Sequence, residues 1–412
     1  MKTKNGLHQA WVVMIGCCFL LMALALITTG LSFFVLPVSK ALGFERGTFT
    51  IYYSLAALVG VFAMPIWGRI IPKIGIKASV AISGAGGAVF MALFSLCRSL
   101  IAFYAVGLLM GIMIAGMTML PASILINAWF ESKRGLAMGI VMACSGVGGA
   151  ICSPILAWVI ETYSWQAGYV VNGVAMAVLT VPTALFLLKG KPSDVGLLPY
   201  GASESADGAA QGSKELTGVS SKIAMKSPAF IMLAVAVVLL NVMASLIQHI
   251  PAHLVQVGID ATMAAGIISI YMLVVIVAKV LLGIANDRFG TGAVLITAFV
   301  LWGASFVVLA VTHGYTVAVI GAALFGLGVS VVTVMPPLLT GQMFGQRDYS
   351  AIYAIIGALS SLGLAIGTPM IGLVYDKTGS YTMAFMGCLA ILVVTIFMLL
   401  AGMKSAKKLP VA

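Results

Sequence analysis

The stretch WVVMIGCCFLLMALALI, residues 11–27, contains no charged side chain and is long enough to cross a bilayer as a helix. The apolar run continues to Phe34, which is too long for the core of a cleavable signal peptide. The whole chain has this character: of its 412 residues, 62% are hydrophobic and only 8% are charged. Soluble domains carry about 25% charged residues. The composition therefore excludes a soluble enzyme, a nucleic-acid-binding module and a disordered protein, and it predicts an integral membrane protein.

Twelve apolar segments follow one another along the chain. They cover residues 10–36, 48–70, 79–97, 101–128, 136–160, 167–188, 229–253, 263–284, 292–312, 316–343, 351–374 and 382–403. Their apolar character is continuous, whereas the strands of a membrane barrel would alternate apolar and polar residues. We therefore predict an all-α membrane protein with twelve transmembrane helices. The predicted domains are an N-terminal six-helix half (1–188), a cytoplasmic loop (189–227) and a C-terminal six-helix half (228–412), and residues 203–221 have the composition of a flexible linker.

The basic residues indicate how the chain is oriented. If the N-terminus is inside and the segments alternate, 17 Lys and Arg fall on the inner side and 4 on the outer side. The inner ones are Lys2, Lys4, Arg69, Lys73, Lys77, Lys133, Arg134, Lys189, Lys191, Lys214, Lys222, Lys226, Arg288, Arg347, Lys404, Lys407 and Lys408. The outer ones are Lys40, Arg46, Arg98 and Lys377. This asymmetry predicts a multi-pass protein of the cell membrane with both termini in the cytoplasm, and it explains the net charge of +11 without an acidic partner.

The two predicted halves match at a constant offset of 215 residues. The matched pairs include Gly68 with Gly283, Gly75 with Gly290, Gly111 with Gly326, Thr118 with Thr333, Pro121 with Pro336, Gly148 with Gly363, and Pro154 with Pro369. Proline and polar matches at one offset are harder to attribute to chance than glycine matches alone. Duplicated six-helix halves are typical of transporters that rock around a site near the midplane. The sequence thus predicts two pseudo-symmetric halves with a substrate site between them.

Two glycine-bounded motifs lie at equivalent places in the repeat. Gly68-Arg-Ile-Ile-Pro-Lys-Ile-Gly75 follows the second segment, and Gly283-Ile-Ala-Asn-Asp-Arg-Phe-Gly290 follows the eighth. Both resemble the G-x-x-x-D-R-x-G signature of the major facilitator superfamily, although Pro72 replaces the acid in the first copy. A glycine at the first position lets neighbouring helices approach closely. We expect Gly68, Gly283, Arg69, Lys73, Asp287 and Arg288 to form a cytoplasmic gate; the alternative is that the charges only set the topology.

Two further motifs narrow the resemblance. Trp129-Phe-Glu-Ser-Lys-Arg-Gly-Leu-Ala-Met-Gly139 and Pro192-Ser-Asp-Val-Gly-Leu-Leu-Pro-Tyr-Gly201 are similar to stretches of the monocarboxylate porters and the oxalate/formate antiporters. Because these motifs lie in loops and hinges, they suggest a group within the superfamily and not a substrate. The likeness covers the whole chain and implies the major facilitator fold.

One basic residue, Lys279, falls inside a predicted span, whereas all eleven acids fall in loops or at span ends. A lysine at that depth costs at least about 2.5 kcal/mol, so it marks a candidate functional site. Its negative counterpart could be the substrate, a small carboxylate; the alternatives are a side chain that extends to the interface or a neutral amine. The resemblance implies the same role, because the related porters carry Arg at this position. The oxalate/formate antiporter adds a second Lys in span eleven, where residues 355–358 hold no charge, and this favours a monoanion.

Other polar residues in the predicted spans could contribute to the substrate site. The candidates are Asn241, Ser245 and His249 in span seven, Tyr271 two turns before Lys279, Thr118 and Thr333 in the repeat, and Tyr353 in span eleven. Hydrogen bonding between helices is the alternative role for each of them. The resemblance places Met119 and Thr333 approximately where the oxalate/formate antiporter has aromatic residues in its pocket. This suggests a more aliphatic pocket here.

These features predict a secondary active transporter of lactate- or pyruvate-like monocarboxylates by alternating access, with proton symport through Lys279, His249 or His253. Anion exchange of the oxalate/formate type and export of drugs or metabolites remain alternatives, as does a non-transporting sensor. We expect no enzymatic activity, because the sequence offers no nucleophile–base pair. The six cysteines lack metal-ligand spacing, so no metal or other cofactor is expected. The expected partners are the substrate, a proton in the case of symport, and the lipid bilayer, with the protein a monomer and no nucleic acid bound.

Overall fold

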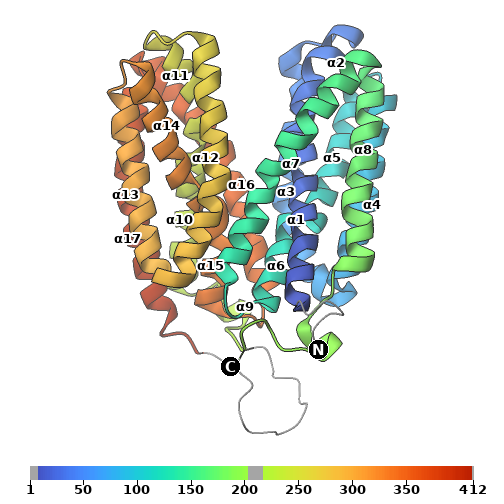
Figure 1. Ribbon diagram of the computed structural model, residues 1–412, viewed down its shortest axis with the longest axis vertical. Helices are drawn as coiled ribbons and strands as arrows, with labels where there is room; N and C mark the ends of the chain where they lie inside the picture. Colours follow the sequence, from blue (N-terminus) through green and yellow to red (C-terminus); the bar gives the residue numbers. More distant parts are fainter. Residues whose placement is uncertain (1–7, 203–216, 411–412) are drawn as a thin grey trace, which may run out of the picture. The chain divides into compact units, whose positions relative to one another are not determined.

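The computed structural model describes residues 8–202 and 217–410, and this part of the chain contains twelve helical segments long and apolar enough to cross a membrane. The prediction of an all-α membrane protein with twelve spans is therefore confirmed, with span ends shifted by a few residues. Backbone packing divides the chain into two compact units, Met1–Lys214 and Glu215–Ala412. The first runs from blue to green in Figure 1 and the second from green to red.

The first half contains six spans, several of which are built from more than one helical piece. Its elements are α1 Gln9–Thr28, η1 Gly30–Phe34, α2 Val35–Leu42, α3 Arg46–Ile74, α4 Ile76–Leu93, η2 Phe94–Leu96, α5 Leu100–Met117, α6 Met119–Trp129, α7 Arg134–Thr162, α8 Trp165–Pro182, η3 Thr183–Leu187 and η4 Pro192–Val195. Serine side chains begin two of these helices, since Ser99 and Ser164 each accept a hydrogen bond from the backbone N–H three residues on.

The second half repeats this order. Its elements are α9 Ser221–Ala224, α10 Pro228–Ala244, η5 Ser245–Gln248, α11 Ile250–Gln256, α12 Ala261–Phe289, α13 Thr291–Ala310, α14 Tyr315–Val329, α15 Val331–Phe344, α16 Tyr349–Thr378 and α17 Thr382–Ala406. Both ends of α12 lie 215 residues after the ends of α3, and the same offset relates the starts of α16 and α7 and of η5 and η1. The repeat read from the sequence is thus present in the helix boundaries, including the break near the end of the first span of each half.

Close approaches between helices also follow the repeat. The backbone of Gly111 on α5 lies against Ala56 on α3, and that of Gly326 on α14 lies against Tyr271 on α12. A Cβ added to Gly111 would lie 2.9 Å from the Ala56 carbonyl carbon, and one added to Gly326 would lie 3.3 Å from the Tyr271 carbonyl oxygen. Small residues permit this contact because no side chain separates the two helices.

The last glycine of each signature motif makes the turn into the next helix. Gly75 has φ +84° and Gly290 has φ +80°, in the region that side-chain-bearing residues rarely adopt. Each ends one long helix, and the following residue, Ile76 or Thr291, begins the next. A Cβ at either glycine would meet no neighbouring atom within 4 Å, so the backbone angle and not crowding requires glycine there.

The loop between the halves is anchored at both described ends. Tyr200 N–H donates to the Trp129 carbonyl at 2.8 Å in the first half, and Val219 N–H donates to the Phe344 carbonyl at 2.8 Å in the second. Gln346 N–H also donates to the Thr217 carbonyl, at 3.0 Å. The prediction of a flexible linker over residues 203–221 was therefore wrong at its C-terminal end, because residues 217–221 are hydrogen-bonded. The rest of the predicted linker, residues 203–216, lies outside the described residues.

Candidate functional site

Lys279 is the one Lys or Arg that is buried in residues 8–202 and 217–410, with 9% of its surface exposed. It lies on α12, ten residues before the helix ends at Phe289. At about 1.5 Å per residue this places it roughly 15 Å from that end, near the middle of a hydrocarbon core about 30 Å thick. Lys279 is thus a buried basic side chain far from either end of a span-length helix.

The described carboxylates lie at helix ends or between spans. In the described part of the chain, Glu45, Asp260 and Asp348 stand directly before helices, and Glu161, Asp287 and Asp376 lie in the last turns of helices. The remaining described acids, Glu131 and Asp194, lie between spans, and Glu204, Asp207 and Glu215 fall outside the described residues. The predicted placement of acids at span ends thus agrees with the structure wherever it is described.

Three helices of the second half that carry polar candidates pack one against the next. Helix α12, which carries Lys279, packs against α15, and α15 packs against α16. Thr333 on α15 has a buried hydroxyl for which the described residues supply no hydrogen-bond partner. Tyr353 on α16 is 2% exposed and stacks on Tyr349, with ring centroids 5.5 Å apart. A buried hydroxyl without a hydrogen-bond partner is costly, so the Thr333 hydroxyl is suited to form a hydrogen bond with a ligand.

Tyr271 lies on α12 two turns before Lys279. Its ring is 5.9 Å from that of Phe325 on α14, and its side chain is half-buried. The contact with Phe325 places this ring beside α14. The predicted sharing of one helix face with Lys279 follows from the eight-residue spacing alone.

The predicted polar stripe of span seven faces α16. Asn241 and Ser245 donate to carbonyls of their own helix, those of Val237 at 2.9 Å and Val242 at 2.6 Å. A Cβ added to Gly363 would lie 2.9 Å from the Asn241 Cβ, and one added to Gly367 would lie 2.5 Å from the Ser245 Oγ. These two side chains therefore lie in the contact between α10 and α16, and the hydrogen bonds that they donate stay within their own span.

His249 connects the same two helices. Its Nε2 lies 3.0 Å from the Thr368 carbonyl oxygen on α16. The regular α-helix ends before it, at Ala244, and a short 3-10 turn intervenes. The helical spacing assumed from Asn241 to His249 is thus interrupted by a change in helix type.

Thr118 marks a break in the fourth span of the first half. With φ −116° and ψ −110° it separates α5 from α6, and its hydroxyl donates to the Ile114 carbonyl at 2.8 Å. The hydroxyl of its repeat partner Thr333 is unsatisfied within the described residues. Equivalent positions in the two halves thus have different hydrogen-bonding states.

The predicted gate residues occupy the last turns of α3 and α12. Gly68 and Gly283 are buried, whereas the side chains of Arg69, Lys73, Asp287 and Arg288 are exposed. The guanidinium of Arg288 lies 5.4 Å from the ring centre of Phe289. The small residues of each motif are thus inside the helix packing, and its charged residues are exposed near the helix end.

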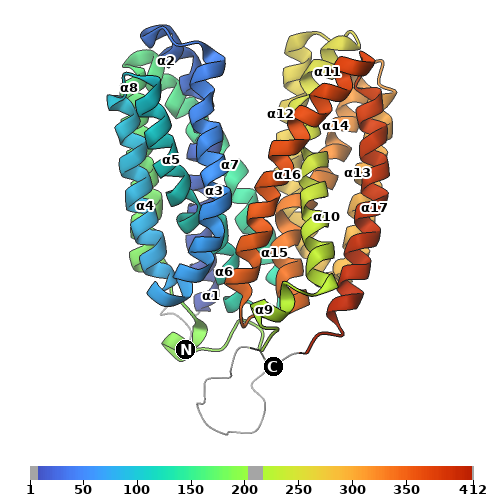
Figure 2. The same cartoon turned by 180° about the vertical axis from the view of Figure 1, so that it is seen from behind.

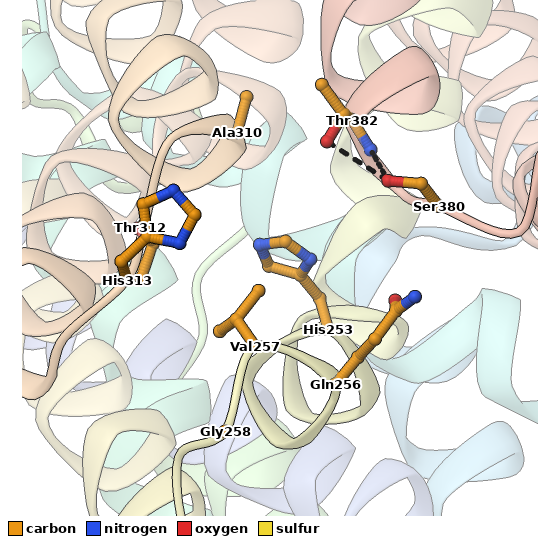
Figure 3. Close-up of a pocket in the computed structure, with 9 residues that line it drawn as sticks. All are labelled: His253, Gln256, Val257, Gly258, Ala310, Thr312, His313, Ser380 and Thr382. Atoms are coloured by element: carbon orange, nitrogen blue, oxygen red, sulfur yellow. Dashed lines mark hydrogen bonds between the residues drawn. The ribbon is translucent and has the colours of Figure 1, made fainter.

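A cavity of about 540 Å³ opens at the end of the second half remote from α9 (Figure 3). It is lined by His253, Gln256, Val257, Gly258, Ala310, Thr312, His313, Ser380 and Thr382. His253 Nε2 lies 2.8 Å from the Leu309 carbonyl oxygen, which fixes the imidazole at the cavity wall. Of the proton-coupling candidates only His253 lines it. The other residues that line the cavity were not predicted from the sequence, because they come from three separate helix ends and share no motif.

The architecture defines a class of protein. The described residues contain twelve helical segments long and apolar enough to cross a membrane, arranged in two repeated halves, and these are features of a secondary transporter. The sequence model of the Major Facilitator Superfamily matches residues 17–276 and 254–411. The chain belongs to this superfamily, and it is a membrane transporter and not an enzyme.

Curated relatives and solved structures agree with this family. The chain is 24% identical over 407 residues to monocarboxylate transporter 12 of Xenopus laevis, covering 93% of this chain and 88% of the relative. It is 26% identical over 337 residues to monocarboxylate transporter 13 of Rattus norvegicus, covering 81% and 74%. The fold is similar to that of the transporter FucP in an outward conformation, with a TM-score of 0.73, 15% identity and coverage of 96% and 99%.

Proposed function

We propose that the protein carries small monocarboxylate anions across the membrane by alternating access, with Lys279 as the positive charge that attracts the carboxylate. The observation that carries the proposal is the burial of this ammonium group near the middle of α12. The names of the relatives support a monocarboxylate as the substrate class.

The electrostatic argument gives a magnitude. A unit charge pair about 4 Å apart gains roughly 4 kcal/mol at an effective dielectric constant near 20, against about 1 kcal/mol in bulk water. Removing one member of a buried charge pair costs about 2–5 kcal/mol. The Lys279 ammonium is thus sufficient to select an anion over an uncharged analogue of the same shape. In this proposal Thr333 and Tyr353 supply hydroxyls, and Asn241 and Ser245 hold α10 against α16.

The proposed coupling is proton symport. Lys279 keeps its proton while the carboxylate is bound, and the second proton site is His249 or His253, whose ring nitrogens already lie 3.0 Å and 2.8 Å from carbonyl oxygens. In the proposed topology both termini lie in the cytoplasm, which the 17-to-4 asymmetry of basic residues supports. The protein is proposed to be a monomer in the cell membrane. In this proposal the exposed charges at the end of α3 and those at the end of α12 are the gating residues of their respective halves.

The test is uptake of labelled lactate and pyruvate into proteoliposomes by wild type, Lys279→Gln and Lys279→Arg. Lys279→Gln is expected to lower kcat/KM by about 30-fold to 1,000-fold, which corresponds to roughly 2–4 kcal/mol. Lys279→Arg keeps the charge and should retain part of the uptake. Undiminished uptake by Lys279→Gln would refute the assignment of the anion site.

A matched control removes a lysine elsewhere. Lys377→Gln changes an exposed residue in the last turn of α16 and should leave uptake unchanged. A pH-sensitive dye inside the vesicles separates the two coupling modes, since symport acidifies the lumen with substrate entry. Substrate entry that needs internal anion and moves no proton would instead assign exchange.

A further inference from the structure

A second cavity lies at the end of the second half that carries the C-terminus. Its volume is about 460 Å³, and it is lined by Lys222, Ile223, Lys226, Ser227, Pro228 and Leu409. We name it the α9 pocket, because the short helix α9 forms one wall. Pro228 is the first residue of α10, so the pocket borders the start of a membrane span.

The segment that follows α17 contributes Leu409 to the pocket wall. A Cβ added to Gly402 would lie 3.3 Å from the Met232 Cβ and 3.6 Å from the Ala229 carbonyl oxygen, so α17 approaches the first turns of α10 closely. The chain then continues beyond α17 to Leu409 in the pocket wall. Figure 2 shows α9, the lower end of α10 and the C-terminal segment at the same end of this half.

The rim of the α9 pocket is strongly cationic. Lys222 and Lys226 lie in its wall, and Lys404, Lys407 and Lys408 stand on the segment leading to Leu409; all five are exposed. The Asp348 carboxylate also reaches α9, but its Oδ2 already accepts a hydrogen bond from Ser221 N–H at 2.7 Å. A phosphate group entering the pocket would therefore meet two lysines in its wall, with three more lysines close to Leu409 along the chain.

The same pocket has apolar walls. Pro228 and Leu409 line it together with Ile223, whose side chain is 46% exposed. An exposed isoleucine between two lysines suits the interface, where apolar groups contact acyl chains and lysines contact head groups. Clusters of four to eight basic residues next to a span attract anionic lipids by about 1 kcal/mol each, a factor of about five per residue.

We propose that the α9 pocket binds the head-group phosphate of an anionic phospholipid from the adjacent leaflet, with the glycerol and acyl region against Ile223, Pro228 and Leu409. The ligand chemistry is an organic phosphate monoanion. Its source is a lipid and not soluble phosphate, because the pocket borders the span and offers apolar contacts beside the lysines. This site is separate from Lys279, so it stands independently of the proposed substrate.

The experiment is native mass spectrometry of the full-length protein after exchange into detergent with equal amounts of phosphatidylglycerol and phosphatidylcholine. Wild type is expected to retain phosphatidylglycerol preferentially. The triple variant Lys222→Gln, Lys226→Gln, Lys408→Gln should reduce that preference by at least about tenfold. The same three positions changed to Arg keep the charge and should restore it.

A matched triple in the first half provides the control. Lys77→Gln, Lys189→Gln and Lys191→Gln remove the same charge at the loop-bearing end of that half and should leave retention unchanged. Equal losses in both Gln triples would overturn the site in favour of general attraction, and so would a wild type without preference. Displacement of phosphatidylglycerol by 10 mM inorganic phosphate, roughly the concentration that saturates a weak anion site, would overturn the lipid as the ligand. Lys222, Lys226 and Lys408 are exposed, and Lys77, Lys189 and Lys191 are exposed or half-buried, so a monodisperse elution profile is expected for each variant.

Discussion

Substituting Gly111 by alanine tests whether the two halves use their repeated glycines equally. The added methyl group would overlap the backbone of Ala56, lying 2.9 Å from its carbonyl carbon and 3.0 Å from its Cα. Backbone atoms cannot rotate away as a side chain does, so α5 must move away from α3. Overpacking costs about 1–3 kcal/mol, and overlap with backbone atoms puts this site in the upper part of that range, at about 2–3 kcal/mol. The better helix propensity of alanine offsets about 1 kcal/mol.

The equivalent substitution in the second half should be much milder. A Cβ at Gly326 would meet the Val274 Cγ1 at 3.1 Å and the Tyr271 carbonyl oxygen at 3.3 Å. The valine methyl can shift by a few tenths of an ångström, and the gain in helix propensity offsets the remaining overlap. We expect a net destabilisation of about 1–2 kcal/mol for Gly111→Ala and close to zero for Gly326→Ala.

Thermal unfolding in detergent, followed by intrinsic tryptophan fluorescence, measures both variants beside wild type. At about 2–4 °C per kcal/mol for units of this size, Gly111→Ala should lower Tm by about 2–8 °C. Gly326→Ala should stay within about 2 °C of wild type. Equal shifts for the two variants, or an unchanged Tm for Gly111→Ala, would show that the backbone contact with Ala56 does not limit the packing of α5.

Three further changes have expected outcomes. Asn172→Ala removes the donor to the Leu26 carbonyl at 3.0 Å, which joins α8 to α1, and should cost about 1–2 kcal/mol in unfolding measurements; Tm equal to wild type would contradict this. Gly290→Ala forces a side chain onto φ +80° and should cost about 1–2 kcal/mol, measured as a lower Tm, without any new steric contact. Burial lowers the pKa of His253, on α11 beyond the span Pro228–Gln248, from its usual 6.5. Because the unfolded chain then binds the proton more tightly, stability should fall as pH drops below about 6.5, and His253→Gln should flatten this part of the Tm–pH curve.

Much of the fold follows from local sequence. Uninterrupted apolar runs of about 20 residues have only a helix as a stable form in lipid, so the twelve spans could be predicted. The 215-residue repeat predicted equivalent elements, and α3 and α12 bear this out at both ends. The burial of Lys279 could also be anticipated, because a basic residue deep in an apolar span is costly in lipid and usually faces the interior of the helix bundle.

The surroundings of each polar residue were decided by tertiary structure. Helical periodicity assigns Asn241 and Ser245 to one face, but it does not say which helix covers that face; the glycines of α16, more than a hundred residues later, do so. Likewise, composition predicted a flexible segment through residue 221, whereas residues 217–221 pair with the loop after α15. Local sequence patterns predict which secondary structure a segment of backbone forms. Contacts between distant segments depend on how whole helices pack, and that information is spread over many residues.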